Sequence, residues 1–335
     1  MNQQSPSIVH WKDRPVFITG ACGFIGSHLA ETLVHAGAQV TALVEYNRMG
    51  SNGWLDTSKL IKEMRIVSGN ICDADFIHQA SEGNDTVFHL AALIGIPYSY
   101  SAPASYIDTN IIGTLNVLQS ARRNGVGRVV HTSTSEVYGT ARYVPIDENH
   151  PLQGQSPYAA SKIGADKLAE AFHLSFDLPC VTVRPFNTFG PRQSSRAVIP
   201  TIISQILRNS RVKLGALTPT RDLNFVSNTV EGFLAAGSSP DAIGRTFNLG
   251  SGHEISIGNL AELIGGIMNC NVEIIADNER VRPSGSEVER LLADNTLARD
   301  VLGWRPQTDL KTGLERTIEW FRENNHYYHD DRYLV

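Results

Sequence analysis

The sequence has few cysteines and no long apolar run, and these absences exclude several classes of protein. The four cysteines, Cys22, Cys72, Cys180 and Cys270, lie far apart without a C-x-x-C pair, which argues against a disulfide framework or a cysteine zinc site. No apolar run reaches the roughly 18 residues of a membrane-spanning helix, and Met1–Lys12 lacks the basic and apolar regions of a signal peptide. We therefore expect a cytoplasmic protein without a metal site or a membrane partner.

The chain also lacks an excess of positive charge. Its 335 residues include 29 lysines and arginines against 34 aspartates and glutamates, which gives a net charge of -5. A nucleic-acid partner bound through a strongly basic face is therefore not expected. An anionic ligand must instead be held by a local cluster of arginines. Hydrophobic residues make up 41% of the chain, which is enough apolar surface to fold rather than remain disordered.

Short β-branched runs alternate with helical patterns through the first two-thirds of the chain. These runs predict strands over 16–19, 39–44, 65–67, 86–90, 128–132 and 180–183. The helical patterns extend from 25 to a stop at Gly37, over 104–124 and over 158–176. Continuous apolar strands that alternate with helices indicate an α/β fold whose doubly wound, Rossmann-type parallel sheet is covered on both faces.

Beyond Pro185 this alternation becomes less regular. Short strands over 212–214, 246–249 and 272–275 are separated by helices and by turns rich in Gly, Pro and Ser. At about 150 residues per domain, the length predicts about two domains. We expect a dinucleotide-binding Rossmann domain over 12–185, a smaller and mainly substrate-binding lobe over 186–325, and a C-terminal tail over 326–335. Such a lobe would pack beside the strand ends, where open α/β sheets bind ligands.

A glycine-rich turn joins the first strand to the first helix. Gly20, Gly23 and Gly26 follow the spacing G-x-x-G-x-x-G, and no Lys-Ser/Thr follows them, which excludes a P-loop. Glycines here permit a tight turn and a close approach of backbone N–H groups to a pyrophosphate, and the helix N-terminus favours the anion. The turn predicts a dinucleotide site that also includes Phe24 and Ile25. The alternative is a purely structural turn.

Two charged residues after the second strand bear on which dinucleotide binds. Glu45 lies about 20 residues past the glycines, where an acidic residue commonly accepts hydrogen bonds from the adenosine ribose and favours NAD. Arg48 could instead meet a 2′-phosphate and favour NADP, and either residue could simply be a solvated loop charge. We expect NAD, because a 2′-phosphate would meet the like charge of Glu45.

Tyr158 and Lys162 are four residues apart and therefore lie on one face of a helix. A nearby ammonium lowers the pKa of a phenol, so the tyrosinate can take a proton from a sugar hydroxyl while hydride leaves the carbon. Taken alone, Y-x-x-x-K is as typical of an exposed helix face. Together with the glycine turn upstream, it predicts a centre that oxidises a hydroxyl group.

Long stretches of the chain resemble the extended short-chain dehydrogenase/reductases that act on nucleotide-activated sugars. These stretches are ITGACGFIGSHLAETL, VEYNRMGSNGWLD, HLAALIGIPYSY, HTSTSEVYGTARYVPIDE, HPLQGQSPYAASKIGADK, RPFNTFGPRQSSRAVIP and TPTRDLNFV. Within that group, the chain resembles the NAD-dependent 4,6-dehydratases of nucleotide-linked N-acetylglucosamine, as in legionaminic acid pathways. The resemblance extends from about Arg14 to Phe321.

The resemblance implies a role for many single residues. Besides the glycine turn and Glu45, the cofactor would contact Asn70, Ile71, Leu90, Ala91, Ala92, Pro185, Tyr158 and Lys162, the last through the nicotinamide ribose. Thr134, Tyr158 and Lys162 would form the hydroxyl-oxidising centre. The diphosphate and nucleoside of a nucleotide-diphosphate sugar would lie near Asn187, Arg192, Arg221 and Arg282, since a diphosphate favours planar, bidentate guanidinium donors. A homodimer built from the helices over 104–124 and 158–176 is also implied.

The stretch Ser133–Gly139 follows the fifth strand and bears on the reaction class. Glu136 is a candidate base for the proton next to a transient ketone. Hexose 4,6-dehydratases carry Thr-Asp-Glu at this place, with the Asp as acid for the departing hydroxyl, whereas this chain has Thr134-Ser135-Glu136. A serine hydroxyl is far too weak an acid to donate a proton outright. Ser135 could therefore only orient the leaving group or relay a proton.

Three functions remain in view. The first, which we expect, is an NAD-dependent 4,6-dehydratase. The second is a nucleotide-uronate decarboxylase or a 4-epimerase on the same scaffold. Decarboxylases of this group carry Thr-Ser-Glu too. They also need a cation beside the sugar carboxylate, and residues 91–97 offer none. The third is a non-catalytic NAD-binding sensor, which could lose Tyr158, Lys162 or Glu136, yet all three are present.

Overall fold

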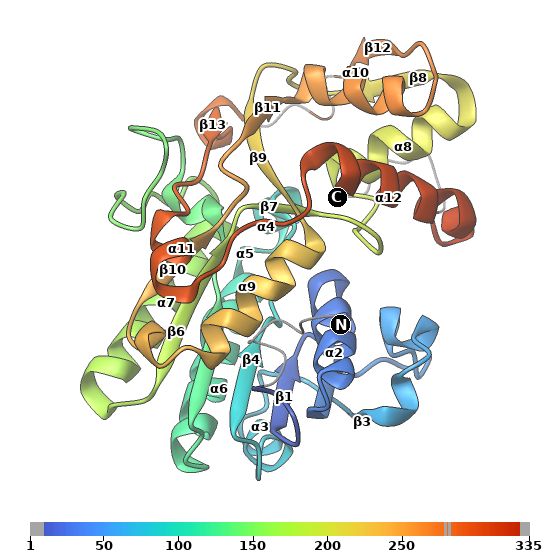
Figure 1. Ribbon diagram of the computed structural model, residues 1–335. Coiled ribbons are helices and arrows are strands. Elements are labelled where there is room, and N and C mark those ends of the chain that lie inside the picture. Colours follow the sequence, from blue (N-terminus) through green and yellow to red (C-terminus); the bar gives the residue numbers. More distant parts are fainter. Residues whose placement is uncertain (1–9, 278–279, 281–282, 329–335) are drawn as a thin grey trace.

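Seven parallel strands form the main sheet of the computed structural model, which describes residues 10–277, 280 and 283–328 (Figure 1). Their order across the sheet is β10, β6, β5, β4, β1, β2 and β3. The strands are β1 (Pro15–Thr19), β2 (Gln39–Glu45), β3 (Arg65–Gly69), β4 (Thr86–His89), β5 (Arg128–Thr132), β6 (Cys180–Pro185) and β10 (Thr246–Leu249). This arrangement confirms the doubly wound, Rossmann-type α/β fold.

The central strands are buried along most of their length because both faces of the sheet are covered. Phe17 and Ile18 of β1 and Val129 and Val130 of β5 have no exposed surface, although successive side chains point to opposite faces. Phe17 stands opposite Val87 of β4 in the parallel register. A half-exposed antiparallel strand would instead alternate apolar and polar residues.

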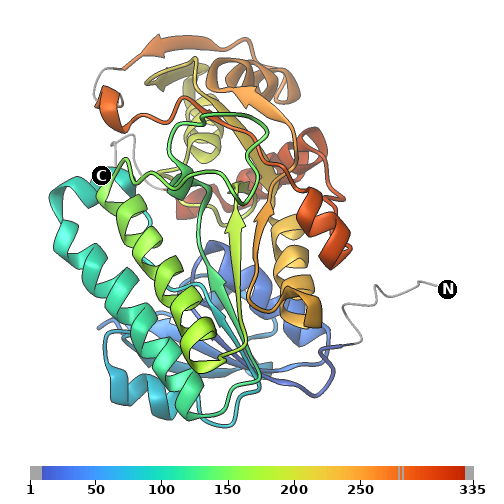
Figure 2. The same cartoon turned by 90° about the vertical axis from the view of Figure 1, so that its left-hand side faces the viewer.

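Helices pack on both faces of this sheet (Figures 1 and 2). One face carries α2 (Phe24–His35) and α9 (Val226–Ser238), and the other carries α3 (Ala74–Ala80), α6 (Gly113–Arg123) and α7 (Pro157–Phe176). The start of α7 follows from its sequence, because the hydroxyl of Ser156 accepts a hydrogen bond from the N–H of Ala159 at 3.1 Å and Pro157 occupies the first turn. The homodimer expected from α6 and α7 stays a prediction.

The helix predicted over 104–124 is interrupted by a wider turn. It consists of α5 (Pro103–Tyr106), the π-helix η3 (Ile107–Ile112) and α6. Within η3, the Asn110 amide accepts from the N–H of Leu93 at 2.8 Å and donates to its carbonyl at 3.0 Å. Asn110 in this π-helix therefore ties the helix to the loop after β4. Single π-helical turns are frequent at functional sites. The apolar periodicity of the sequence did not indicate the interruption.

The lobe contains two further sheets. Strand β9 (Thr220–Phe225) pairs with β7 (Asn187–Phe189), β11 (Glu254–Ser256) and β13 (Arg290–Leu291), and β8 (Arg211–Leu214) pairs with β12 (Glu273–Ala276). The lobe helices are α8 (Val198–Asn209), α10 (Ile257–Ile267) and α12 (Leu310–Asn324). The other helical segments are α4 (Ile96–Ser101), α11 (Thr296–Leu302) and the 3-10 turns η1 (Gly53–Thr57), η2 (Ile61–Glu63), η4 (Ser135–Tyr138), η5 (Pro240–Ala242), η7 (Ser284–Ser286) and η8 (Asn325–Tyr327).

Two segments beyond Pro185 belong to the main sheet rather than to the lobe. Residues 246–249, which we expected in the lobe, form β10 beside β6, and α9 packs against β5 and β6. The reason is burial on both faces, since Phe247 and Leu249 on one face and Asn248 on the other have no exposed surface. Among the described helices, none has the length and apolar composition that crossing a membrane requires.

Candidate active site

A cavity of about 840 Å³ lies at the carboxyl ends of the main-sheet strands, between the sheet and the lobe. The chain leaves β1 toward β2 and β3 and then returns to β4 on the other side of β1. The connections after β1 and β4 therefore diverge, and a crevice forms between them. Gly20, Thr134 and Pro185 line the cavity from the sheet, and Leu214 and Arg221 line it from the lobe.

The glycine turn forms one wall of this cavity, together with Phe24 and Ile25. A Cβ atom on Gly26 would lie 2.1 Å from the carbonyl oxygen of Gly20, and one on Gly20 would lie 2.7 Å from the backbone nitrogen of Ala91. Gly23 caps α2 without a side-chain hydrogen bond, so the first N–H groups of the helix are left for an anion. This cradle fits the pyrophosphate of a dinucleotide.

The residues predicted for the adenosine end also line the cavity. Glu45 at the end of β2 lies there with Asn70 and Ile71, which follow β3. Arg48 is not among the lining residues within the described part of the chain. An acceptor for ribose hydroxyls is therefore at hand, while a 2′-phosphate would meet the Glu45 carboxylate. The residues present fit NAD rather than NADP.

The loop after β4 is held in place by Thr19 at the end of β1. Leu90, Ala91 and Ala92 line the cavity, and the Thr19 hydroxyl accepts hydrogen bonds from the N–H groups of Leu90 and Ala91, both at 3.1 Å. Pro185 lines the same cavity at the end of β6. Five different strand ends thus bring to one cavity the residues of the sheet that were predicted to contact the cofactor, and α7 adds Tyr158 and Lys162.

Tyr158 and Lys162 reach this cavity from the first turns of α7. Both side chains are buried, and Lys162 Nζ donates to the carbonyl oxygen of Thr132 at 2.6 Å. Burial lowers the pKa of Lys162 to about 8, against the charge of Asp166, which raises it. Burial raises the pKa of the Tyr158 phenol, and a hydrogen bond from Thr134 lowers it. Burial thus disfavours both the Tyr158 phenolate and the Lys162 ammonium, and the neighbours Thr134 and Asp166 favour these charged forms.

Thr134, Ser135 and Glu136 line the cavity at the start of η4. The hydroxyl of Thr134 accepts a hydrogen bond from the N–H of Glu136 at 3.2 Å, which fixes the turn. Ser135 is buried, and Glu136 is half-buried. The Glu136 carboxylate lies near enough to Tyr158 for its charge to raise the pKa of the phenol. The predicted catalytic residues are thus gathered at one place.

Two of the four residues predicted to bind the substrate line the cavity. Asn187 Oδ1 is buried and has no hydrogen-bond partner among the described residues, which leaves it for a ligand. Arg221 is held by Glu287 at 3.1 Å and by the carbonyl oxygen of Thr220 at 2.9 Å. A guanidinium fixed in this way is oriented for an anionic ligand before the ligand arrives.

The other two residues are not placed in the cavity. Arg192 does not line it, and its guanidinium forms a bidentate ion pair with Glu31 of α2, with both contacts at 2.9 Å. Its backbone has a φ of 70°, in the left-handed region. The structure therefore does not place Arg192 at the predicted diphosphate site. Its guanidinium instead links the loop after β7 to Glu31 of α2. Arg282 lies outside the described residues.

Three charged residues that the sequence did not single out also line the cavity: Arg196, Arg280 and Glu287. A Cβ atom on Gly95 would lie 3.8 Å from a guanidinium nitrogen of Arg196. Residues 91–97 themselves contain no cation, as the sequence shows, but the lobe places the cation of Arg196 beside them. Arg196 follows Gly95 by about a hundred positions, so only the packing of the lobe against the loop after β4 brings them together.

Comparison with known proteins agrees with this geometry. Residues 17–317 match the family described as GDP-mannose 4,6 dehydratase. A UDP-glucose 4-epimerase of Mycolicibacterium smegmatis is 35% identical over 314 residues, which cover 92% of this chain and 98% of the relative. A dTDP-glucose 4,6-dehydratase of an Actinoplanes species is 31% identical over 320 residues, with the same coverage of 92% and 98%.

A solved structure shows the same fold with a cofactor. The dTDP-glucose 4,6-dehydratase DesIV of Streptomyces venezuelae, solved with NAD bound, has a TM-score of 0.85 and 30% sequence identity, covering 93% of this chain and 98% of that one. Epimerases and dehydratases thus stand side by side among the relatives, and the N-acetylglucosamine pathway type stays a prediction. This chain belongs to the GDP-mannose 4,6 dehydratase family, and it is an enzyme of the nucleotide-sugar dehydratase and epimerase group of extended short-chain dehydrogenase/reductases.

Proposed function

We propose that the protein is an NAD-dependent nucleotide-sugar 4,6-dehydratase that converts a nucleotide-linked hexose, with N-acetylglucosamine as the expected sugar, to its 4-keto-6-deoxy form. The observation that carries this proposal is the Glu136 carboxylate in the same cavity as Tyr158 and Lys162. A 4-epimerase needs one base, which removes and returns the proton of the C4 hydroxyl. Elimination of water across C5 and C6 needs a second proton acceptor, and Glu136 supplies it.

The first step is oxidation at C4. Tyr158 takes the proton of the C4 hydroxyl, and the ammonium of Lys162 stabilises the phenolate that accepts it. NAD, held by the glycine turn and Glu45, supplies the acceptor for the C4 hydride when it is bound, and the same hydride is returned later in the turnover. Asn187 and Arg221 hold the diphosphate end of the substrate and act by binding alone.

The second step is the loss of water. A ketone at C4 acidifies the C5 proton, so Glu136 can remove it once oxidation is complete. Since Ser135 is too weak an acid to protonate the departing C6 hydroxyl, Glu136 also delivers that proton, as a syn elimination on one face of the sugar. Ser135 orients the hydroxyl by hydrogen bonding. A proton from solvent would then add to C5 as the hydride returns to C6, and Tyr158 would release the C4 hydroxyl proton to solvent. The 4-keto-6-deoxy sugar is thus formed with the net loss of one water.

Arg196 favours a second candidate, the decarboxylation of a nucleotide-linked uronic acid. Its guanidinium lies beside the loop over 91–97, where a sugar carboxylate could meet it. A ketone at C4 would favour loss of carbon dioxide from C5, and Glu136 would then only return a proton to C5. This candidate uses the same oxidation step, so the products separate the two functions.

The test is a panel of nucleotide sugars. Glucose, N-acetylglucosamine and glucuronic acid, each linked to UDP, dTDP, GDP or CDP, are incubated with the purified protein, and the product masses are measured. Loss of one water from a hexose supports the dehydratase. Loss of carbon dioxide, or an unchanged mass with inverted C4, assigns the decarboxylase or the epimerase and contradicts the proposal. The same panel with Tyr158→Phe identifies any background reaction.

We expect Arg221→Ala to raise KM by about 10- to 100-fold while kcat changes little. A charge-assisted hydrogen bond contributes about 1.5–3 kcal/mol, and a contact to the diphosphate is equal in the ground and transition states. Arg221→Lys is the matched control, since it keeps the charge but loses the fork, and its KM should fall in between. A collapse of kcat at unchanged KM would place Arg221 among the catalytic residues instead.

A further inference from the structure

The carboxylate of Asp166 lies about one helical turn beyond Lys162 on α7, and its side chain is only 4% exposed. Oδ1 lies 3.1 Å from Nε2 of His131. Oδ2 accepts from the Ser133 hydroxyl at 2.7 Å and from Nε and an η nitrogen of Arg184 at 3.2 and 3.0 Å. One buried carboxylate thus joins α7 to β5 and β6 next to the catalytic centre.

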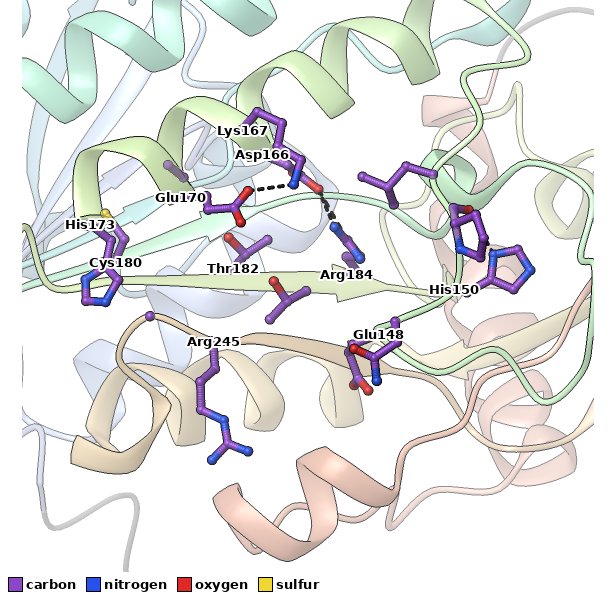
Figure 3. A pocket seen from close by; sticks show the side chains of 16 residues that line it. Glu148, His150, Asp166, Lys167, Glu170, His173, Cys180, Thr182, Arg184 and Arg245 are labelled. Carbon is purple, nitrogen blue, oxygen red and sulfur yellow. Dashed lines mark hydrogen bonds and ion pairs between the residues drawn. The ribbon is translucent and has the colours of Figure 1, made fainter. Parts of the chain in front are cut away.

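These contacts enclose the turn that carries Thr134, Ser135 and Glu136. On its entry side, Ser133 donates to Asp166 and its N–H donates to the carbonyl oxygen of Val183 at 2.7 Å. On its exit side, Tyr138 accepts from Arg184 at 2.9 Å, and Arg184 in turn holds Asp166 (Figure 3). A change at Asp166 is therefore felt at both ends of η4, which presents the second catalytic base.

Lys162 is fully buried, and its one hydrogen-bond acceptor in the described structure is the neutral carbonyl oxygen of Thr132. An ammonium in such a place is costly unless an anion lies nearby. The titratable and charged groups that interact with Lys162 or with its neighbours Tyr158 and Asp166 come from several elements. They are Tyr158 and Asp166 on α7, His131 on β5, His89 on β4, Glu136 on η4, Arg184 on β6 and Tyr106 on α5.

Among these groups, the two carboxylates act on different members of the pair. Asp166 acts on Lys162, whose pKa it raises, while the charge of Glu136 acts on Tyr158. Burial lowers the pKa of both His131 and His89, so these rings are neutral and add no cation that would repel Lys162. Arg184 is the other cation on Asp166, so the cluster has one carboxylate for two cations.

We propose that Asp166 is a positioning residue of this active site: its carboxylate keeps Lys162 charged and fixes the turn that presents Thr134 and Glu136. The proposal rests on the proposed function only in its oxidation step, in which Lys162 assists Tyr158. It therefore holds for a dehydratase, a decarboxylase or a 4-epimerase alike. A salt bridge that only stabilised the fold would leave the charge of Lys162 unchanged when it was removed.

The experiment follows the titration of Lys162 directly, by NMR of protein labelled with ¹⁵N-lysine. The chain has seven lysines, and all except Lys162 are exposed, so the buried ammonium stands apart from the others. In the wild type we expect its midpoint at about pH 8. Asp166→Asn removes the charge that raises this midpoint, so the ammonium should be lost at a pH lower by about one unit or more.

Two further variants separate charge from structure. Ser133→Ala removes one hydrogen bond to the same carboxylate but keeps its charge, so the midpoint should stay at the wild-type pH. The double variant D166N/R184Q removes both charges together, which leaves no buried guanidinium without its carboxylate and protects the fold. Both residues also line a second cavity of about 350 Å³ (Figure 3). The midpoint should still fall in the double variant, but by less than in Asp166→Asn, because the loss of the Arg184 cation offsets part of the lost attraction.

An unchanged Lys162 midpoint in Asp166→Asn and in the double variant would overturn the proposal, and so would a fall of equal size in Ser133→Ala. The kinetic counterpart is the alkaline limb of the C4-oxidation rate, which should move to lower pH by the same amount in Asp166→Asn. The NMR titration needs no substrate. If no nucleotide sugar on the panel were dehydrated, the proposed function would fail while the inference about Asp166 would still be decided.

Discussion

Glu136→Gln will oxidise its substrate at C4 but will not release water, so the absorbance of reduced nicotinamide will rise and persist. The amide keeps the shape of the side chain but can neither take the C5 proton nor deliver one to the C6 hydroxyl. Tyr158 and Lys162 remain in place, so oxidation proceeds and the return of hydride has no acceptor carbon. We expect formation of the 4-keto-6-deoxy product to fall by at least about a hundredfold, as for removal of a general base.

The matched control is Ser135→Ala in the neighbouring position of the same turn. Its hydroxyl only orients the leaving group, and a water molecule can replace it, so we expect a loss of no more than about tenfold. The two variants are compared by product mass and by the absorbance of the enzyme during turnover. Normal dehydration by Glu136→Gln would contradict the mechanism and move the decarboxylase or the epimerase ahead.

An isotope experiment tests the same mechanism without a mutation. A nucleotide sugar deuterated at C4 should give a product that carries this deuterium at C6, because the hydride is taken and returned within one turnover. The position of the label is read by NMR of the product. Deuterium that appears in the solvent, or that remains at C4 of an epimerised sugar, would exclude the internal transfer on which the dehydratase depends.

Tyr158→Phe should lose at least about a hundredfold in turnover while binding of the nucleotide sugar is largely kept. The substitution removes the hydroxyl that takes the C4 proton and leaves the ring, which is buried and packed against Tyr106 with 6.2 Å between ring centroids. Turnover is measured at saturating substrate, and binding is measured separately by calorimetry. Because oxidation precedes every other step, no reduced nicotinamide should form in this variant.

Tyr106→Phe is the matched control for this prediction. Tyr106 is a buried tyrosine beside Tyr158, but its hydroxyl donates to the carbonyl oxygen of Gly95 and does not line the cavity. The same chemical change should therefore cost stability, about 0.5–1.5 kcal/mol for one hydrogen bond, rather than oxidation. If both variants lost turnover equally, the effect would come from packing, and Tyr158 would not be the base.

Features encoded by neighbouring residues were predicted correctly from the sequence. Six of the seven main-sheet strands were predicted for this sheet from short β-branched runs, since burial on both faces removes the polar alternation of a half-exposed strand. The glycine turn was recognised because Gly20 and Gly26 stand where a Cβ atom would collide with backbone. Tyr158 and Lys162 were paired by helical spacing alone. In each case the pattern that allows the prediction lies within a few residues of the chain, even where the contact that requires it, such as that of Gly20 with Ala91, is made with a distant segment.

Contacts between distant segments were decided only by the tertiary structure. Residues 246–249 joined the main sheet because β6 offered an open edge, Arg192 turned to Glu31 on α2, and Arg196 came to lie beside Gly95. Asp166 gained its place next to Lys162, His131 and Arg184 only when α7 packed on β5 and β6. The residues next to a charged side chain in the sequence do not indicate which group it will contact, because strand order and helix packing determine that partner.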